Sequence, residues 1–220
     1  MIVRMPEYLK KAGIAAAIVF LLLLLLVGLR LNSVSSLDRA VSNALAMNDF
    51  TAGSLFLRTV WILGSPLADF IYAVILSGLL YFSNLRIPAI WIMLTYITGI
   101  IVGQILKVAI GRTRPAGHLS GGYSFPSNHL LAAFIVITII FVLILPNLSS
   151  NNLKVWFGWA AITFGLLLIE AGVYLQEHFI TDNLAGGSFG IAWVTLWIWL
   201  YEKYARRLHD RIPALKYDEI

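Results

Sequence analysis

Residues 20–26 read FLLLLLL, an unbroken apolar run inside a longer apolar segment at residues 12–29. A helix of about 20 apolar residues is long enough to cross the hydrocarbon of a bilayer. Lys10 and Lys11 precede the run, as basic residues precede the core of a secretory signal peptide. The apolar core is longer than the roughly 7–15 residues of such peptides, however, and no small-residue cleavage site follows it. We interpret this segment as a retained signal anchor.

Five further apolar segments of similar length follow, at residues 67–83, 87–107, 129–146, 155–176 and 183–201. The 220-residue chain is 60% hydrophobic and 12% charged, about half the charged fraction of soluble domains. A globule of this size cannot bury so much apolar surface. The sequence therefore predicts an all-α integral membrane bundle of about six transmembrane helices, with residues 1–220 forming a single membrane-embedded domain.

Residues 30–66 join the first two segments and differ from them in composition. They contain NSVSSLDRAVSNALAMNDF at 32–50 and LFLRTVWILG at 55–64, in which apolar residues recur at helical spacing. This pattern is typical of amphipathic helices that lie at a membrane surface. We expect one or two such helices here.

Lysine and arginine are distributed unequally between the two sides of such a bundle. With six spans, both termini and the second and fourth loops share one side, which carries ten of these residues, and the other side carries six. Because cytoplasmic loops are enriched in Lys and Arg, we expect a multi-pass cell-membrane protein with cytoplasmic termini.

The net charge of +5 does not indicate a nucleic-acid partner, because no basic run alternates with aromatic residues. We attribute it to cytoplasmic flanks and anionic lipid headgroups. The chain has no cysteine, which excludes disulfides, zinc–thiolate sites and cysteine nucleophiles.

The loop GRTRPAGHLSGGYSFPSNH, at residues 111–129, is unusually polar and is expected on the extracytoplasmic side. Lys107, Arg112 and Arg114 cluster around its start, and arginine has a planar fork that matches phosphate oxygens. Ser127 is a natural N-cap for the next helix, whose free N–H groups and dipole favour a bound anion. Taken alone, the cationic cluster could also make ordinary contacts with lipid headgroups.

Two histidines are expected near this loop. His178 and Asp182 lie four residues apart in HFITD, so on a helix they share a face. The carboxylate can hold one imidazole nitrogen and leave the other free to attack. Because the fourth and fifth spans form a round trip, His129 ends on the same membrane face as His178. Cations, one nucleophilic histidine and one acidic histidine could together transfer a phosphoryl group without a metal.

At these residues the chain resembles the type 2 phosphatidic acid phosphatase family of membrane lipid phosphatases. The first motif of the family is Lys, six residues and Arg-Pro, which Lys107, Arg114 and Pro115 match. The second motif, Pro-Ser-Gly-His, is present as PSNH at residues 126–129, with Asn128 in place of glycine. The six-span layout and the order of the motifs extend the resemblance over most of the chain.

The third motif of the family is matched only in part. It reads Ser-Arg, five residues, His, three residues and Asp, and its second half matches His178 and Asp182. Ala171 and Gly172 stand where the family has serine and arginine. Arg112 is one residue that could compensate for the missing charge.

The resemblance implies a role for each matching residue. His178 would be the nucleophile that forms a phosphohistidine, Asp182 would orient it, and His129 would protonate the leaving group. The phosphate oxygens would be held by Lys107, Arg114, Ser127 and the backbone near Asn128. The resemblance also implies that neither metal nor cofactor is needed.

Glu170 is a further possible site residue, because acidic residues inside a span often have functional roles. It precedes His178 by eight residues, on roughly the same face of a continuous helix and about 12 Å deeper. The alternative is a protonated or hydrogen-bonded glutamate between helices.

The sequence thus predicts an enzyme that hydrolyses a lipid phosphate or diphosphate through a phosphohistidine. Phosphatidic acid, phosphatidylglycerol phosphate and a polyprenyl diphosphate all remain open as substrates. A phosphotransferase with the same site and a catalytically silent phospholipid-binding protein are the alternatives. The expected partners are the lipid substrate and the bilayer, and the sequence does not determine the oligomeric state.

Overall fold

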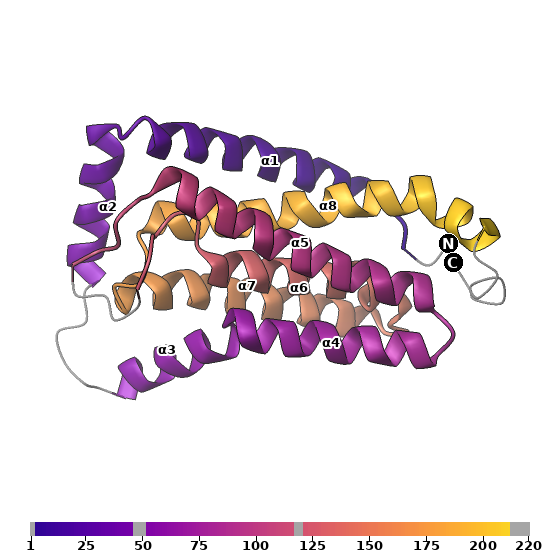
Figure 1. Cartoon of the computed structure of the whole chain (residues 1–220). Coiled ribbons are helices and arrows are strands. Elements are labelled where there is room, and N and C mark those ends of the chain that lie inside the picture. The colour runs from indigo at the N-terminus through magenta and orange to yellow at the C-terminus, as the bar shows by residue number, and fades with distance from the viewer. Residues whose placement is uncertain (1–2, 46–51, 117–120, 212–220) are drawn as a thin grey trace.

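The computed structural model describes residues 3–45, 52–116 and 121–211, and every regular element in these ranges is helical. The elements are α1 (Glu7–Gly28), α2 (Asn32–Leu45), α3 (Ala52–Leu63), α4 (Pro66–Phe82), α5 (Arg86–Ile110), α6 (Asn128–Leu143), a 3₁₀ turn (Leu145–Asn147), α7 (Asn151–Tyr174) and α8 (Ile180–Arg211). Figure 1 shows the long helices aligned along one axis, with α2 lying across one end and both termini at the other. The all-α prediction is confirmed.

Helix length and composition support about six membrane spans within the described ranges. Five helices are long and apolar enough to cross a bilayer: α1, α5, α6 with its 3₁₀ turn, α7 and α8. The sixth span is a bent pair, Gly53–Leu63 and Pro66–Phe82, whose two halves differ in direction by 47°. The predicted bundle is therefore confirmed, although α8 continues ten residues beyond the predicted end at residue 201.

The second span bends at a Gly-Ser-Pro step. A Cβ atom on Gly64 would lie 2.5 Å from a methyl group of Leu168, so only glycine lets this point approach α7 closely. Ser65 then caps α4 by accepting a hydrogen bond from the N–H of Ala68, and Pro66 occupies the first turn. Of the two amphipathic stretches, 32–50 thus forms α2 across the end of the bundle, whereas 55–64 belongs to the bent span.

Large apolar side chains cover the outside of the bundle. Ile18 on α1 and Leu166 on α7 are each 62% exposed, and Trp156 on α7 is 72% exposed. Such a surface is stable against lipid but not against water. It supports the membrane location predicted from the composition.

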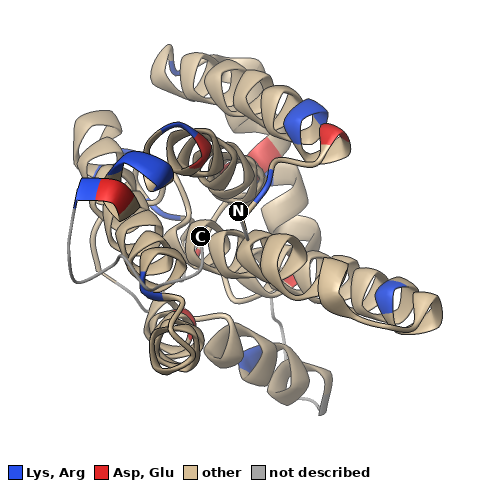
Figure 2. Ribbon diagram, turned by 90° about the vertical axis from the view of Figure 1, so that its right-hand side faces the viewer, with Lys and Arg blue, Asp and Glu red and all other residues tan. Residues whose placement is uncertain are grey.

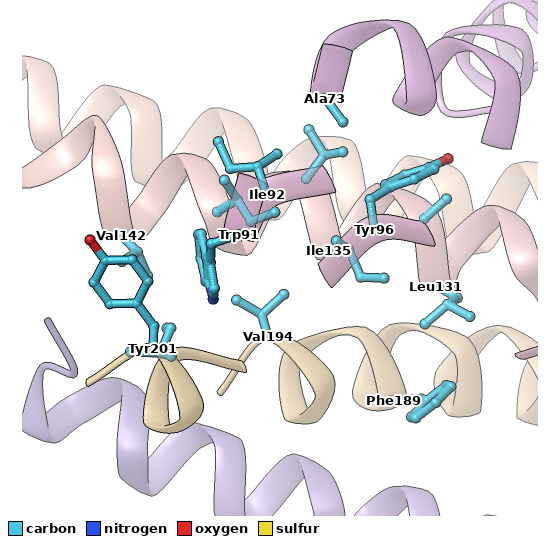
Figure 3. Close-up of a cluster of buried hydrophobic side chains, with 14 of the residues drawn as sticks. Ala73, Trp91, Ile92, Tyr96, Leu131, Ile135, Val142, Phe189, Val194 and Tyr201 are labelled. Carbon is cyan, nitrogen blue, oxygen red and sulfur yellow. The ribbon is translucent and has the colours of Figure 1, made fainter. Parts of the chain in front are cut away.

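The centre of the bundle is formed where α5, α6 and α8 meet. Figure 3 shows Trp91 and Ile92 of α5, Ile135 of α6 and Val194 of α8 packed into one apolar cluster. Close contact between α6 and α8 depends on small residues, because a Cβ atom on Gly190 would lie only 2.9 Å from the carbonyl oxygen of Leu131. This tight pairing fixes the start of α8 beside the start of α6.

Basic residues mark the end of the bundle opposite α2. Figure 2, viewed toward the end that carries both termini, shows lysines and arginines at helix ends while most of each helix is uncharged. Because both termini lie at this end, the chain crosses the bundle an even number of times. The polar 111–129 loop consequently belongs to the other end, together with α2.

Candidate active site

Lys107 lies in the last turn of α5, under the loop that follows. Gly111 ends the helix in the left-handed conformation (φ 62°), and its N–H donates to the carbonyl of Lys107. The Lys107 ammonium is only 6% exposed and donates to the carbonyl oxygens of Tyr123 and Ser124, at 3.0 and 3.2 Å. An ammonium has three donors, so one N–H remains for a phosphate oxygen.

The start of α6 presents free backbone donors to the same region. Ser127 is fully buried and caps the helix by accepting a hydrogen bond from the N–H of Leu130. The first N–H groups of α6, those of Asn128 and His129, have no acceptor inside the helix. The Asn128 side chain points toward α5, where it donates to Gln104. Any phosphate contact from Asn128 therefore comes from its backbone.

His178 lies in the turn between α7 and α8 and is 2% exposed. The N–H groups of Glu177 and His178 both donate to the carbonyl oxygen of Gly172 at 3.0 Å, which fixes the turn. The imidazole Nδ1 is 3.8 Å from a carboxylate oxygen of Asp182, and Nε2 is 3.5 Å from Nη1 of Arg114. Burial lowers the pKa of His178 below its ordinary value of 6.5, so the ring is neutral and nucleophilic at pH 7.

Arg114 is held against His178 by Glu177. Its Nη1 donates to the Glu177 carbonyl oxygen at 2.6 Å and to the Glu177 carboxylate at 3.2 Å. Sequence reasoning favoured a solvated Glu177, but it is 7% exposed and orients this arginine. The Nε atom of Arg114 is buried and has no hydrogen-bond partner among the described residues, as expected of a donor that awaits an anion.

Asp182 is fully buried at the start of α8 and is held in place by several donors. One carboxylate oxygen accepts from Arg112 at 2.6 Å, and the other accepts from the Ser124 hydroxyl and from the N–H of Phe179. Arg112 was expected to bind phosphate, but in the structure its guanidinium binds this carboxylate and stacks on the Phe179 ring. We interpret Arg112 as a residue that positions Asp182.

Asp38 of α2 completes this network and was missed by the sequence reasoning. It is fully buried, pairs with Arg112, and accepts hydrogen bonds from the N–H and hydroxyl of Thr181. A signal was present in the sequence: Asp38 follows Val34 by four residues and precedes Val41 by three, on the apolar face of the helix. An acid on that face requires a buried partner.

Trp61 of α3 was also missed, and it covers the two histidines. Its ring stacks on that of His129, with centroids 3.8 Å apart and planes 11° apart, and its centroid is 6.0 Å from that of His178. A Cβ atom on Gly172 would lie 3.0 Å from Trp61 and 2.6 Å from the side-chain nitrogen of Asn183. Trp61 and Asn183 therefore occupy the space that a larger side chain at position 172 would need.

Comparison with known proteins assigns this arrangement to a family. A family model described as the PAP2 superfamily matches residues 88–206, more than half of the chain, including Lys107, Arg114, His129, His178 and Asp182. The chain belongs to the PAP2 superfamily.

Two proteins of Bacillus subtilis are similar to this PAP2 chain. Phosphatidylglycerophosphatase B of strain 168 is 29% identical over 188 residues, which cover 77% of this chain and 85% of the relative. The crystal structure described as the first transmembrane PAP2 type phosphatidylglycerolphosphate phosphatase aligns with a TM-score of 0.74 at 25% identity. That alignment covers 87% of this chain and 96% of the other.

Glu170 does not belong to the PAP2 site. Helix α7 ends at Tyr174, so His178 lies in a turn rather than on a continuous helical face. Glu170 is an exposed residue of α7, and the expectation that it shares a face with His178 is wrong. Within residues 3–45, 52–116 and 121–211, no three His, Asp or Glu residues are grouped to hold a metal ion.

Restoring the PAP2 arginine by a Gly172→Arg substitution is expected to lower stability and activity. The new Cβ atom would be 2.6 Å from Asn183 and 3.0 Å from Trp61, and such overpacking costs about 1–3 kcal/mol. Thermal unfolding in detergent and phosphate release measure the two effects. Trp61→Ala in the same chain should recover part of the stability. A single variant that is as stable as wild type and more active would show that the site has room for the arginine.

Proposed function

We propose that this protein is a membrane lipid phosphatase that removes a terminal phosphate from a lipid through a phosphohistidine on His178. The observation that carries the proposal is the environment of this imidazole, which is buried and neutral, with Nδ1 near a carboxylate and Nε2 facing Arg114. The names of both similar proteins favour phosphatidylglycerol phosphate as the substrate. Phosphatidic acid and a polyprenyl diphosphate are the competing substrates.

In the first step, Nε2 of His178 attacks the phosphorus atom and the bond from phosphorus to the lipid oxygen breaks. His129 donates a proton to that oxygen, so the lipid leaves as a neutral alcohol. Asp182 stabilises the positive charge that develops on His178, because its carboxylate is 3.8 Å from Nδ1. Stacking on Trp61 keeps the His129 ring in one orientation.

In the second step, a water molecule attacks the phosphohistidine while His129 accepts a proton from it. The bond between phosphorus and Nε2 breaks, which releases phosphate and restores His178. Lys107, Arg114 and the first N–H groups of α6 stabilise the phosphate oxygens in both steps.

Phosphate release from a lipid panel tests the proposal. Purified protein in detergent should release phosphate fastest from phosphatidylglycerol phosphate, compared with phosphatidic acid and a polyprenyl diphosphate. Because Lys107 and Arg114 supply the positive charge, we expect the rate to be unchanged in excess EDTA. Loss of activity in EDTA that Mg²⁺ or Zn²⁺ restores would contradict metal independence.

We propose that the active site faces the extracytoplasmic side, on the basis of the ten-to-six bias of Lys and Arg. The chain has no native cysteine, so single cysteines can report on topology. A cysteine in place of the exposed Tyr123 should react with an impermeant maleimide from outside intact cells. One in place of the exposed Asn152 should react only after the membrane is opened. The reverse pattern would place the active site in the cytoplasm.

A catalytically silent phospholipid-binding protein is the second candidate, and one observation favours it. Trp61 lies flat on His129, and Gly172 leaves no arginine at a position where PAP2 proteins of the resembling family carry one. Turnover of every lipid in the panel at the rate of the His178→Ala variant would support this candidate. Phosphate release well above that variant would exclude it.

A further inference from the structure

A second cavity lies beside the active site, at the same end of the bundle. It has a volume of about 440 Å³ and is bordered by the end of α1, the start of α2 and the residues that follow α5. Its lining includes three arginines: Arg30, Arg39 and Arg112. Of the catalytic and phosphate-binding residues proposed above, none lines it, so the cavity is separate from the phosphoryl-transfer centre.

The polar part of this cavity is suited to an anion. Arg30 and Arg39 are exposed, and the first turn of the 14-residue helix α2 contributes Val34 and Ser35, where the helix dipole is positive. The acidic groups nearest to Arg112 are Asp38 and Asp182, both fully buried and already bound to it. Three guanidinium groups therefore face one cavity without an acidic side chain among its lining residues.

The remainder of the cavity is apolar and leads toward the membrane spans. Leu26 and Val27 belong to the last turns of α1, and Ile110 is the last residue of α5. Cationic side chains next to apolar side chains match a phospholipid, whose charged headgroup joins apolar chains at the same depth. The volume is within the usual range for small-ligand sites.

We propose that this cavity binds the phosphodiester headgroup of an anionic phospholipid, as a second ligand that is not hydrolysed and that raises turnover. The effect on turnover rests on the proposed phosphatase function, whereas the binding does not. Arg112 provides the link, because it lines the cavity and also donates to Asp182 at 2.6 Å. An anion in the cavity neutralises the repulsion among the three arginines, which holds Arg112, and through it Asp182, in the arrangement that supports His178.

Binding is tested without any substrate. We expect phosphatidylglycerol added to the full-length protein in a neutral detergent to raise its thermal unfolding temperature, and phosphatidylcholine to have a smaller effect. Arg39→Gln should weaken the phosphatidylglycerol effect about fivefold in concentration, the usual contribution of one arginine beside an anionic lipid. Arg206→Gln, an exposed arginine of α8 at the opposite end, is the matched control and should leave the effect unchanged.

Arg30 offers a variant that removes charge without harming the fold. It has a φ of 52°, a left-handed conformation that glycine adopts more easily than arginine. Arg30→Gly should therefore be no less stable than wild type and should still lose about fivefold in the phosphatidylglycerol effect. A loss of lipid response in this variant cannot be attributed to misfolding.

Turnover is then measured on a short-chain lipid phosphate in neutral detergent, with and without phosphatidylglycerol. Phosphatidylglycerol should raise the rate of wild type and of Arg206→Gln, and far less that of Arg39→Gln. Equal stabilisation by phosphatidylcholine, or unchanged binding in both cavity variants, would overturn the binding site. A raised KM of Arg39→Gln without any anionic lipid would show that the cavity holds the substrate, and would also overturn the proposal. Lipid-dependent stabilisation in a protein that hydrolyses no lipid would leave the binding site standing and refute the proposed phosphatase.

Discussion

His178→Ala should abolish phosphate release from every lipid and from activated aryl phosphates, because no other group replaces Nε2 as the nucleophile. His129→Ala should also lose most activity on lipids, since their alcohol leaving groups need a proton. On an aryl phosphate, whose leaving group needs no proton, His129→Ala should recover much of the wild-type rate. General-acid catalysis typically contributes about 10²–10⁴-fold for a poor leaving group, and the ratio of lipid to aryl rates measures this contribution.

The comparison depends on both variants being folded. His178 is 2% exposed and His129 stacks on Trp61, so each replacement needs a check of thermal unfolding in detergent. His178→Gln and His129→Gln, which keep more of the side-chain volume, serve as matched variants. Equal rescue of the two alanine variants by the aryl phosphate would contradict the assignment of nucleophile and acid.

Asp38→Ala is expected to cause the largest loss of stability among single substitutions in the site. It removes a fully buried carboxylate and leaves Arg112 and Thr181 without this partner. Removing one member of a buried ion pair typically costs about 3–5 kcal/mol. Thermal unfolding in detergent should show a large decrease, with a parallel loss of phosphate release because Arg112 no longer holds Asp182 firmly.

Two variants separate this explanation from a general effect of charge. Asp38→Asn keeps an acceptor for Thr181 and should be less destabilising than Asp38→Ala. Glu7→Gln removes an exposed carboxylate near the N-terminus and should leave stability almost unchanged. If Asp38→Ala unfolds at the same temperature as Glu7→Gln, the network around Arg112 contributes little to the fold.

The helical bundle was predictable because its signal is local. Each long apolar segment is sufficient to indicate a span, and capping residues such as Ser127 mark where a helix begins. The bent span was not predictable, because the direction of α3 depends on the contact between Gly64 and Leu168, which are distant in sequence. The length of α8 was underestimated, because its last turns are polar and lack the signal of a membrane span.

The site was predictable in part for the same reason. The spacing of Lys107, Arg114, His129 and His178 carries the pattern of the resembling family, and the structure brings these residues to one end of the bundle. The supporting residues Asp38 and Trp61 come from α2 and α3, and no spacing rule links those helices to the motifs. Glu170 was misplaced because the prediction extended α7 through His178, whereas a turn separates them.

The central claim is that His178 carries the phosphoryl group covalently. Protein incubated briefly with a lipid labelled in its terminal phosphate and then denatured in alkali, in which phosphohistidine survives, should retain label that acid removes. Mass spectrometry should place that phosphate on the peptide containing His178, and the His178→Ala variant should retain none. Label on another residue, or label that persists on His178→Ala, would contradict the mechanism.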